Sequence, residues 1–357
     1  RYDYYLDDNV AFEAFKAGAY DVRSESSAKN WATRYMGKNF ASGYIVKDQQ
    51  KNDAAQDTRW LAFNIQRPVF ADRRVRQAVS LAFDFEWMNK ALFYNAYSRP
   101  NSYFQNTEYA ARGYPDAAEL LLLGPLKNEL PPEVFTSIYQ PPTSNGDGFD
   151  RENLLKAGRL LDEAGWVLKG QQRVNQKTGQ PLRFELLLAS GGNDQWVMPF
   201  QHNLQRLGVR MDIRQVDISQ LTNRLRKRDY DMMPSLWRAT PWPSADLQIS
   251  WSSAYINSSY NAPGVANPAI DSLINQIIRW QGNKQKLVPL GRALDRVLTW
   301  NNYMLPMWYM SGSRTAYWNK FSYPQVHPLY SSSIDAPGFD TWWYDVNKAA
   351  TLPAARR

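Results

Sequence analysis

The residues best suited to binding chemistry lie in one aromatic segment, WRATPWPSADLQISWSSAYINSSY, which covers residues 237–260. Aromatic rings such as Trp237 and Trp242 can wall apolar pockets or stack on the flat faces of other molecules, including sugars. Arg238 can hold a carboxylate through two parallel N–H donors, and it can equally form a structural ion pair. The tryptophans could instead fill a hydrophobic core, and for Trp251 we expect that role.

Nucleophilic and metal chemistry have little support elsewhere in the chain. Cysteine is absent, which excludes disulfides, thiolate catalysis and Cys-based zinc or iron–sulfur sites. His202 and His327 are far apart in the sequence and lack metal-ligand spacing. A histidine metal site or a Ser-His-Asp triad would therefore exist only if the fold brought suitable residues together. Carboxylates are abundant, but no motif couples a nucleophile to a base. We therefore predict no cofactor, metal or catalytic residue, and a hydrolase is a less favoured function for this chain.

The size and charge of the chain limit the remaining possibilities. Its 357 residues are enough for two or three domains, and no apolar run approaches the ~18–20 residues that span a bilayer. No initiator Met or signal segment begins it, so we expect a processed or truncated chain. The net charge is +8, and the densest basic run, residues 224–228, is followed at once by Asp229 and Asp231. We predict the solvated end of a helix there and no nucleic-acid partner.

Periodicity predicts the elements that must position the aromatic segment. Residues 60–88 predict a half-buried strand through Leu61, Phe63 and Ile65, a break at Pro68, and a helix capped by Asp72. Residues 150–165 predict a second capped helix, and residues 184–213 predict a strand, helix and strand in a βαβ crossover. The other expected elements are a helix over 218–228, a strand from Tyr230, helices over 268–281 and 285–301, and an aromatic strand over 305–313.

Several of these segments resemble, in order, motifs of the family 5 periplasmic solute-binding proteins of ABC transporters, which bind peptides, nickel or oligosaccharides. The motifs are AGAYD at 17–21, FNIQRPVFADRRVRQAVSLAFD at 63–84, DRENLLKAGRLLDEAGW at 150–166 and the Tyr230–Asp231 pair. The resemblance is strongest to the oligopeptide binders. It implies an α/β fold of the periplasmic binding protein type II-like class, periplasmic localisation and an inner-membrane ABC permease as partner.

The resemblance also implies that this chain is the C-terminal part of a longer protein whose N-terminal half is absent. On that basis residues 1–65 are expected to form part of domain I, and residues 66–304 domain III, the ligand-binding lobe. Residues 305–357 are expected to supply a return strand and the C-terminal part of domain I. Phe63 and Asn64 would then lie near the hinge.

The same resemblance places a ligand site in the aromatic segment. The implied ligand is an oligopeptide, including peptide-linked antibiotics such as microcin C, bound in an interlobe cleft by hinge closure. An oligosaccharide receptor of the same fold is the alternative. The expected ligand-binding residues are Trp237, Arg238, Thr240, Trp242, Asp246 and Tyr255.

One position departs from the family pattern. Peptide binders commonly carry an aspartate three residues after the first tryptophan, where it holds the α-ammonium of the peptide, and this chain has Thr240 there. Asp246 could take over that role from a shifted loop. Otherwise the peptide N-terminus is held by the missing half, or the ligand has no free amine at that place.

Overall fold

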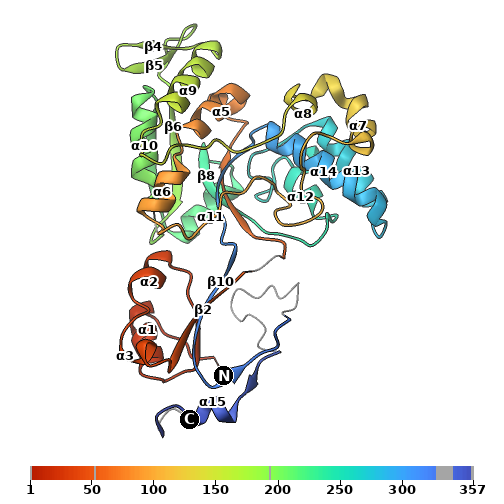
Figure 1. The fold of residues 1–357 in the computed structure, drawn as a ribbon. Coiled ribbons are helices and arrows are strands. Elements are labelled where there is room, and N and C mark those ends of the chain that lie inside the picture. Colours follow the sequence, from red (N-terminus) through yellow and green to blue (C-terminus); the bar gives the residue numbers. More distant parts are fainter. Residues whose placement is uncertain (1, 52–53, 193, 327–340, 355–357) are drawn as a thin grey trace. The chain divides into compact units, whose positions relative to one another are not determined.

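The computed structural model describes residues 2–51, 54–192, 194–326 and 341–354 (Figure 1). The chain forms two compact units. Unit 1 comprises 1–54, 93–96 and 310–357, and unit 2 comprises 55–92 and 97–309. These boundaries differ by several residues from the domain limits expected from sequence, and the assignment of the parts to domains I and III stays a prediction.

Unit 2 is built on a five-stranded mixed sheet in the order β7-β6-β8-β3-β9. The strands are β3 (Thr58–Phe63), β6 (Arg183–Ala189), β7 (Arg210–Val216), β8 (Met232–Trp237) and β9 (Met304–Trp308). β7 and β8 run parallel to β6, whereas β3 runs antiparallel to both β8 and β9. The helix α10 (Val197–Arg206) connects β6 to β7, so the expected βαβ crossover is confirmed.

Helices of unit 2 bury apolar stripes against this sheet and against one another. In chain order they are α4 (Pro68–Ala71), α5 (Arg73–Leu81), α6 (Phe85–Ala91), α7 (Ala117–Leu123), α8 (Glu133–Thr136), α9 (Arg151–Glu163), α10, α11 (Ile218–Arg226), α12 (Leu247–Trp251), α13 (Pro268–Arg279) and α14 (Lys284–Trp300). Two 3₁₀ turns, η1 (Gly124–Glu129) and η2 (Ser253–Tyr255), and the hairpin of β4 (Trp166–Lys169) and β5 (Gln172–Asn175) complete the unit. Figure 1 shows α13 and α14 packed side by side, as their contacts require.

Local capping explains where the two best-predicted helices begin. The Asp72 carboxylate accepts the Arg74 amide at 2.8 Å, and the Asp150 carboxylate accepts the Asn153 amide at 2.8 Å. Each bond satisfies an amide that the first turn of a helix leaves unpaired. Gly165 follows α9 with a φ of 82°, a conformation that glycine adopts without steric cost. Both helix starts expected from the sequence are therefore confirmed.

The strand β3 is more deeply buried than its sequence pattern indicated. It ends at Phe63, and residues 60–63 are all fully buried rather than alternately exposed. The side chain of Trp60 joins the core formed with α13 and α14, and that of Phe63 packs on Phe70 of α4 at 4.9 Å between ring centroids. The expectation of a half-buried strand is wrong, because β3 lies inside the sheet with packed layers on both faces.

The single strand expected over residues 305–313 is also wrong. β9 pairs with β3 in unit 2, with Leu305 opposite Leu61, whereas β10 (Gly312–Trp318) belongs to the sheet of unit 1. Tyr309 leaves β9 to form an isolated bridge with Ser98. β3 thus pairs with only the first part of the expected strand, because two different sheets recruit its two ends.

The basic run at residues 224–228 is only partly solvated. Arg224 pairs with Glu185 at 2.7 Å and with Asp229 at 3.1 Å. Arg228 is buried and donates to the carbonyls of Asn261 and Ala262 at 2.8 and 2.9 Å. The expectation of a solvated helix end is therefore wrong for Arg228, because its guanidinium satisfies the carbonyls of a distant loop.

Unit 1 is a smaller α/β body. Its three-stranded antiparallel sheet has the order β1-β10-β2, with β1 (Val22–Ser24) and β2 (Ile45–Lys51) on either side of β10. The helices α1 (Asp8–Lys16), α2 (Ala28–Thr33) and α3 (Lys38–Ala41) precede β2, and β11 (Phe321–Ser322), β12 (Trp343–Tyr344) and α15 (Val346–Ala350) follow β10. Phe15, Trp31 and Trp318 are central to its core.

Candidate ligand site at the end of strand β8

The strand β8 leads into the aromatic segment and has one open edge. It pairs with β3 over its whole length, from Met232 opposite Phe63 to Trp237 opposite Thr58. Its ladder with β6 is confined to one pair, Leu186 and Met232. In the described part of the chain, residues 233–237 therefore have no strand partner on the β6 side. An extended segment of another molecule can pair with such an edge through main-chain hydrogen bonds.

Four aromatic side chains of unit 2 meet at Trp237, the last residue of β8. Trp60 of β3 stacks on Tyr103, with ring centroids 4.3 Å apart and planes within 6°. Tyr103 also makes edge-to-face contacts with Trp237 (5.7 Å) and Trp251 (5.1 Å), and these two tryptophans lie 5.4 Å apart. Offset and edge-to-face ring pairs add stability beyond the apolar area that they bury. The four rings therefore form a rigid cluster.

Within this cluster the two tryptophans have different surroundings. Trp251 is fully buried and belongs to the core, as expected from the sequence. Trp237 is only partly buried, and its indole N–H donates to the Tyr103 carbonyl at 2.5 Å. Because that bond fixes its ring, the part of Trp237 that is exposed presents a preorganised apolar surface. Its contact with a ligand stays a prediction.

Arg238 and Thr240 follow Trp237 in an exposed loop. The Arg238 side chain is 77% exposed and lies 3.4 Å from the Asp57 carboxylate, an ion pair worth little in such a setting. Asp57 is anchored by the Ala239 amide, which donates to it at 2.7 Å. The Thr240 hydroxyl donates to the Trp242 carbonyl at 2.8 Å. Local bonds thus hold the backbone of this loop, while the Arg238 guanidinium extends into solvent.

The remaining expected site residues lie further along the chain and are exposed. Trp242 is 52% exposed and Tyr255, in η2, is 40% exposed. Asp246 is exposed at the start of α12, where the Ser244 hydroxyl lies 3.3 Å from its carboxylate. Among the described residues no hydrogen bond or ring contact joins Tyr255 to the other five. The structure therefore places Trp237 at the end of β8, Arg238, Thr240 and Trp242 in the loop that follows it, and Asp246 and Tyr255 on later turns.

Two residues of this region escaped the sequence reasoning. Tyr103 precedes Trp237 by 134 residues, and Asp57 precedes Arg238 by 181. Neither belongs to a motif with a local chemical signature, and no spacing rule connects segments so far apart. Only the pairing of β3 with β8 reveals the proximity of Asp57 to Arg238.

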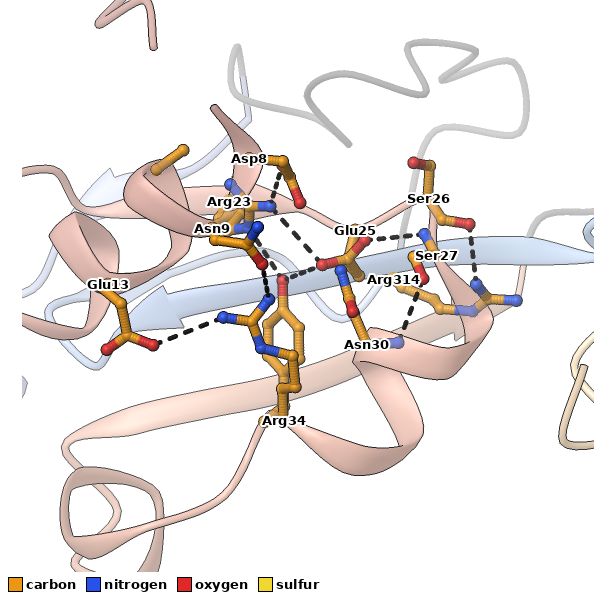
Figure 2. Close-up of polar contacts among 12 residues, drawn as sticks. Asp8, Asn9, Glu13, Arg23, Glu25, Ser26, Ser27, Asn30, Arg34 and Arg314 are labelled. Atoms are coloured by element: carbon orange, nitrogen blue, oxygen red, sulfur yellow. Dashed lines mark hydrogen bonds and ion pairs between the residues drawn. The ribbon is translucent and has the colours of Figure 1, made fainter. Parts of the chain in front are cut away.

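A second polar cluster lies in unit 1, where Figure 2 shows it between α1, β1 and α2. Arg23 lies 2.5 Å from Asp8 and 3.6 Å from Glu25. The buried Glu25 accepts the Ser27 amide at 2.7 Å and the Tyr35 hydroxyl at 2.9 Å. Burial, together with the charge of Glu25, raises the pKa of the Tyr35 hydroxyl. Both Glu25 oxygens accept bonds from the protein itself, so this cluster fastens the unit together.

Metal and membrane features were also searched for in the described ranges. They contain no group of three or more His, Cys, Asp or Glu that could hold a metal ion. His202 is exposed on α10, and His327 lies outside the described residues. No helix within these ranges has the length and hydropathy needed to cross a bilayer.

Comparison with known proteins assigns the family. Residues 1–259 match the model of the bacterial extracellular solute-binding proteins, family 5, middle region. The chain belongs to this family, as its motifs predicted.

Two relatives and one solved structure show how far the likeness extends. The chain is 76% identical over 357 residues to "Uncharacterized protein YejA" of Escherichia coli (strain K12), of which it covers 58%. It is 37% identical over 346 residues, 96% of its length, to "Probable peptide-binding protein YejA" of Agrobacterium fabrum, of which it covers 56%. The chain thus spans little more than half the length of these relatives.

The fold is shared with the oligopeptide-binding protein AppA of Bacillus subtilis, solved in complex with a nonapeptide. The TM-score is 0.66 at 17% identity, over 95% of this chain and 58% of AppA. The α/β fold of the type II-like periplasmic binding proteins, expected from the motifs, is therefore confirmed.

Proposed function

We propose that this chain is part of the solute-binding component of a periplasmic ABC importer that captures oligopeptides. The observation that carries the proposal is the open edge of β8, which ends at the partly buried and hydrogen-bonded Trp237. Backbone pairing recognises any peptide, whereas aromatic walls accept varied side chains. A relative that is 37% identical is named a probable peptide-binding protein, which supports the same ligand class.

The proposal extends to how the whole protein works. In the full-length protein, units 1 and 2 would contribute to domains I and III, and hinge closure of two lobes would enclose the ligand before delivery to an inner-membrane permease. Peptide-linked antibiotics such as microcin C fall within the proposed ligand class, because pairing along the backbone leaves a terminal substituent unconstrained. In this proposal the protein binds its ligand without chemical conversion.

Calorimetry of the full-length protein tests the ligand class. Its titration with a pool of synthetic oligopeptides should release heat without consuming peptide, and its titration with oligosaccharides should not. Binding of oligosaccharides alone would identify a sugar receptor, and appearance of cleaved peptide would identify a hydrolase. Either result would refute the proposal.

Two variants test the site. Trp237→Ala should weaken peptide binding by about 2 kcal/mol, or about thirtyfold in Kd, because central aromatic residues dominate binding energy. Trp280→Ala is the matched control, since Trp280 is also exposed but lies at the end of α13, outside the proposed site. Equal losses in both variants would contradict the proposed role of Trp237.

The α-ammonium of the peptide needs a carboxylate that Thr240 does not supply. We propose Asp246 for this role, because it is exposed and, among the residues that the structure describes, only the Ser244 hydroxyl lies within hydrogen-bond distance of its carboxylate. Asp246→Asn should then weaken binding of free peptides but not of peptides acetylated at the N-terminus. If both kinds of peptide bind the variant as they bind the unmodified protein, Asp246 is not the anchor.

A further inference from the structure

A buried carboxylate lies behind the aromatic cluster, outside the proposed site. Asp295, on α14, is fully buried. One of its oxygens accepts the Tyr103 amide at 2.8 Å and the other accepts the Ala111 amide at 2.9 Å. A further hydrogen bond comes from the Ser102 side chain. This carboxylate thus holds two turns of the loop that precedes α7.

Arg296, the next residue of α14, holds a different segment of the same loop. Arg296 is buried, pairs with Glu119 at 2.7 Å, and donates to the carbonyls of Arg112 and Gly113 at 3.0 and 2.8 Å. Two adjacent buried charges therefore fix one loop with opposite chemistry, the acid through amides and the base through carbonyls. Of the two, Asp295 is the one bonded to Tyr103.

Tyr103 connects this clamp to the proposed ligand surface. Its amide is bonded to Asp295, and its carbonyl accepts the indole N–H of Trp237. Its ring fills the space between Trp60 and Trp251. A shift of this residue would change both the hydrogen bond and the ring contact that orient Trp237.

We propose that Asp295 is a positioning residue for peptide binding, which acts through Tyr103 to hold the indole of Trp237 in its binding orientation. The inference rests on the proposed function for its effect on affinity. Its structural step, from Asp295 to Trp237, is independent of any ligand.

An acceptor oxygen for each of the two amides is what the arrangement requires of Asp295. A carboxylate offers acceptors on both oxygens, whereas an asparagine offers one acceptor and one N–H₂ donor. In Asp295→Asn the N–H₂ group would face the amide of Tyr103 or Ala111, and a buried donor would lack a partner. The charged group that faces Asp295 is Arg296 of its own helix, and the other titratable groups are the neutral hydroxyls of Tyr103 and Tyr139 from the loops packed on it.

Three variants of the full-length protein separate positioning from general damage. Asp295→Asn leaves one of the two loop amides, that of Tyr103 or that of Ala111, without an acceptor. Glu119→Gln is the matched control, since it is equally buried and also weakens the clamp on this loop but leaves Tyr103 bonded to Asp295. If Asp295→Asn does not fold, Ser102→Ala removes a single hydroxyl from the same carboxylate and serves in its place.

The first readout is the ¹H–¹⁵N resonance of the Trp237 indole, identified by its disappearance in Trp237→Phe. A hydrogen-bonded indole N–H has a distinct shift and slow exchange with solvent. Asp295→Asn should move this resonance and speed its exchange, whereas Glu119→Gln should leave both unchanged. An unchanged resonance in Asp295→Asn, or equal changes in the two variants, would overturn the structural step.

The second readout is the Kd for the tightest-binding synthetic peptide of the pool. Asp295→Asn should weaken it about tenfold, the effect of one buried hydrogen bond, and Glu119→Gln less than about twofold. A moved indole resonance with unchanged affinity would overturn the role of Asp295 in binding. If the unmodified protein binds no peptide, the proposed function fails instead, and the indole resonance alone decides whether Asp295 positions Trp237.

Discussion

The burial of Asp295 predicts an unusual dependence of stability on pH. Burial raises the pKa of this carboxyl to about 6, and hydrogen bonds from Ala111, Ser102 and Tyr103 only partly oppose the rise. In the unfolded chain an aspartate has a pKa of about 3.9. The difference of about two units corresponds to about 3 kcal/mol between the two protonation states.

Whether stability rises or falls with pH depends on which state, folded or unfolded, binds the proton more tightly. Below about pH 4 the carboxyl is protonated in both states, and its favourable contribution to folding is fully present. Between about pH 4 and 6 the unfolded chain releases the proton while the folded protein retains it, so stability falls as pH rises. Above about pH 6 both states are ionised and the contribution is lost.

Urea unfolding of the protein and of Asp295→Asn, at intervals from pH 4 to 7.5, measures this contribution. Subtraction of the two free energies removes the titration of every other group that the substitution leaves unperturbed. From the low to the high end of the range, the unmodified protein should lose between about 2 and 3 kcal/mol relative to the variant, because the unfolded carboxyl is already about half ionised at pH 4. Thr299→Val, a buried substitution on the same helix without a titratable group, should differ from the unmodified protein by a constant amount.

A difference between the protein and Asp295→Asn that stays constant within about 0.5 kcal/mol would refute the reasoning, since two units of pKa shift cannot be hidden in it. A difference of opposite slope would mean that the hydrogen bonds outweigh burial and lower the pKa of the carboxyl.

Two further predictions concern packing and backbone conformation. Trp251→Ala should destabilise unit 2 by about 3–5 kcal/mol, because it empties a fully buried aromatic site, and a small change in the urea midpoint would contradict the core role of Trp251. Gly208→Ala should cost about 1–3 kcal/mol in a thermal melt, because φ is +76° and the added Cβ would lie 2.9 Å from Leu168 Cδ1 and 3.0 Å from the Arg173 amide nitrogen. Gly170→Ala is the control, because φ there is +60° and the space around it is open. It should lose only the stability that a left-handed backbone conformation costs an alanine. Equal losses in the two variants would show that the close approach at Gly208 is unimportant.

Features set by short stretches of chain were predictable. A carboxylate two or three residues before a helical stripe marks a cap, so Asp72 and Asp150 located the starts of α5 and α9. An apolar strand, a helix and a second strand with a glycine between them predict a βαβ unit, because parallel neighbours need such a crossover. Trp251 was correctly expected in the core.

Features that depend on distant partners were not predictable. Residues 305–313 were expected to form one strand, and the competition between two sheets divides the segment from Met304 to Trp318 instead. The sequence around Arg228 has the composition of a solvated helix end. Arg228 is nevertheless buried, because carbonyls thirty or more residues away require donors. Sequence spacing contains no information about either partner.

By itself, then, the sequence of this protein determined its local elements, its family motifs and the aromatic segment at 237–260, because each depends on residues a few positions apart. The tertiary structure alone decided that β8 keeps an open edge, that Trp237 is hydrogen-bonded to Tyr103, and that Asp295 holds Tyr103 from behind. The physical reason is the same in each case. Each depends on segments that are distant in the sequence, and both hydrogen bonds span more than a hundred residues, so they exist only after β3, β8 and α14 pack into one unit.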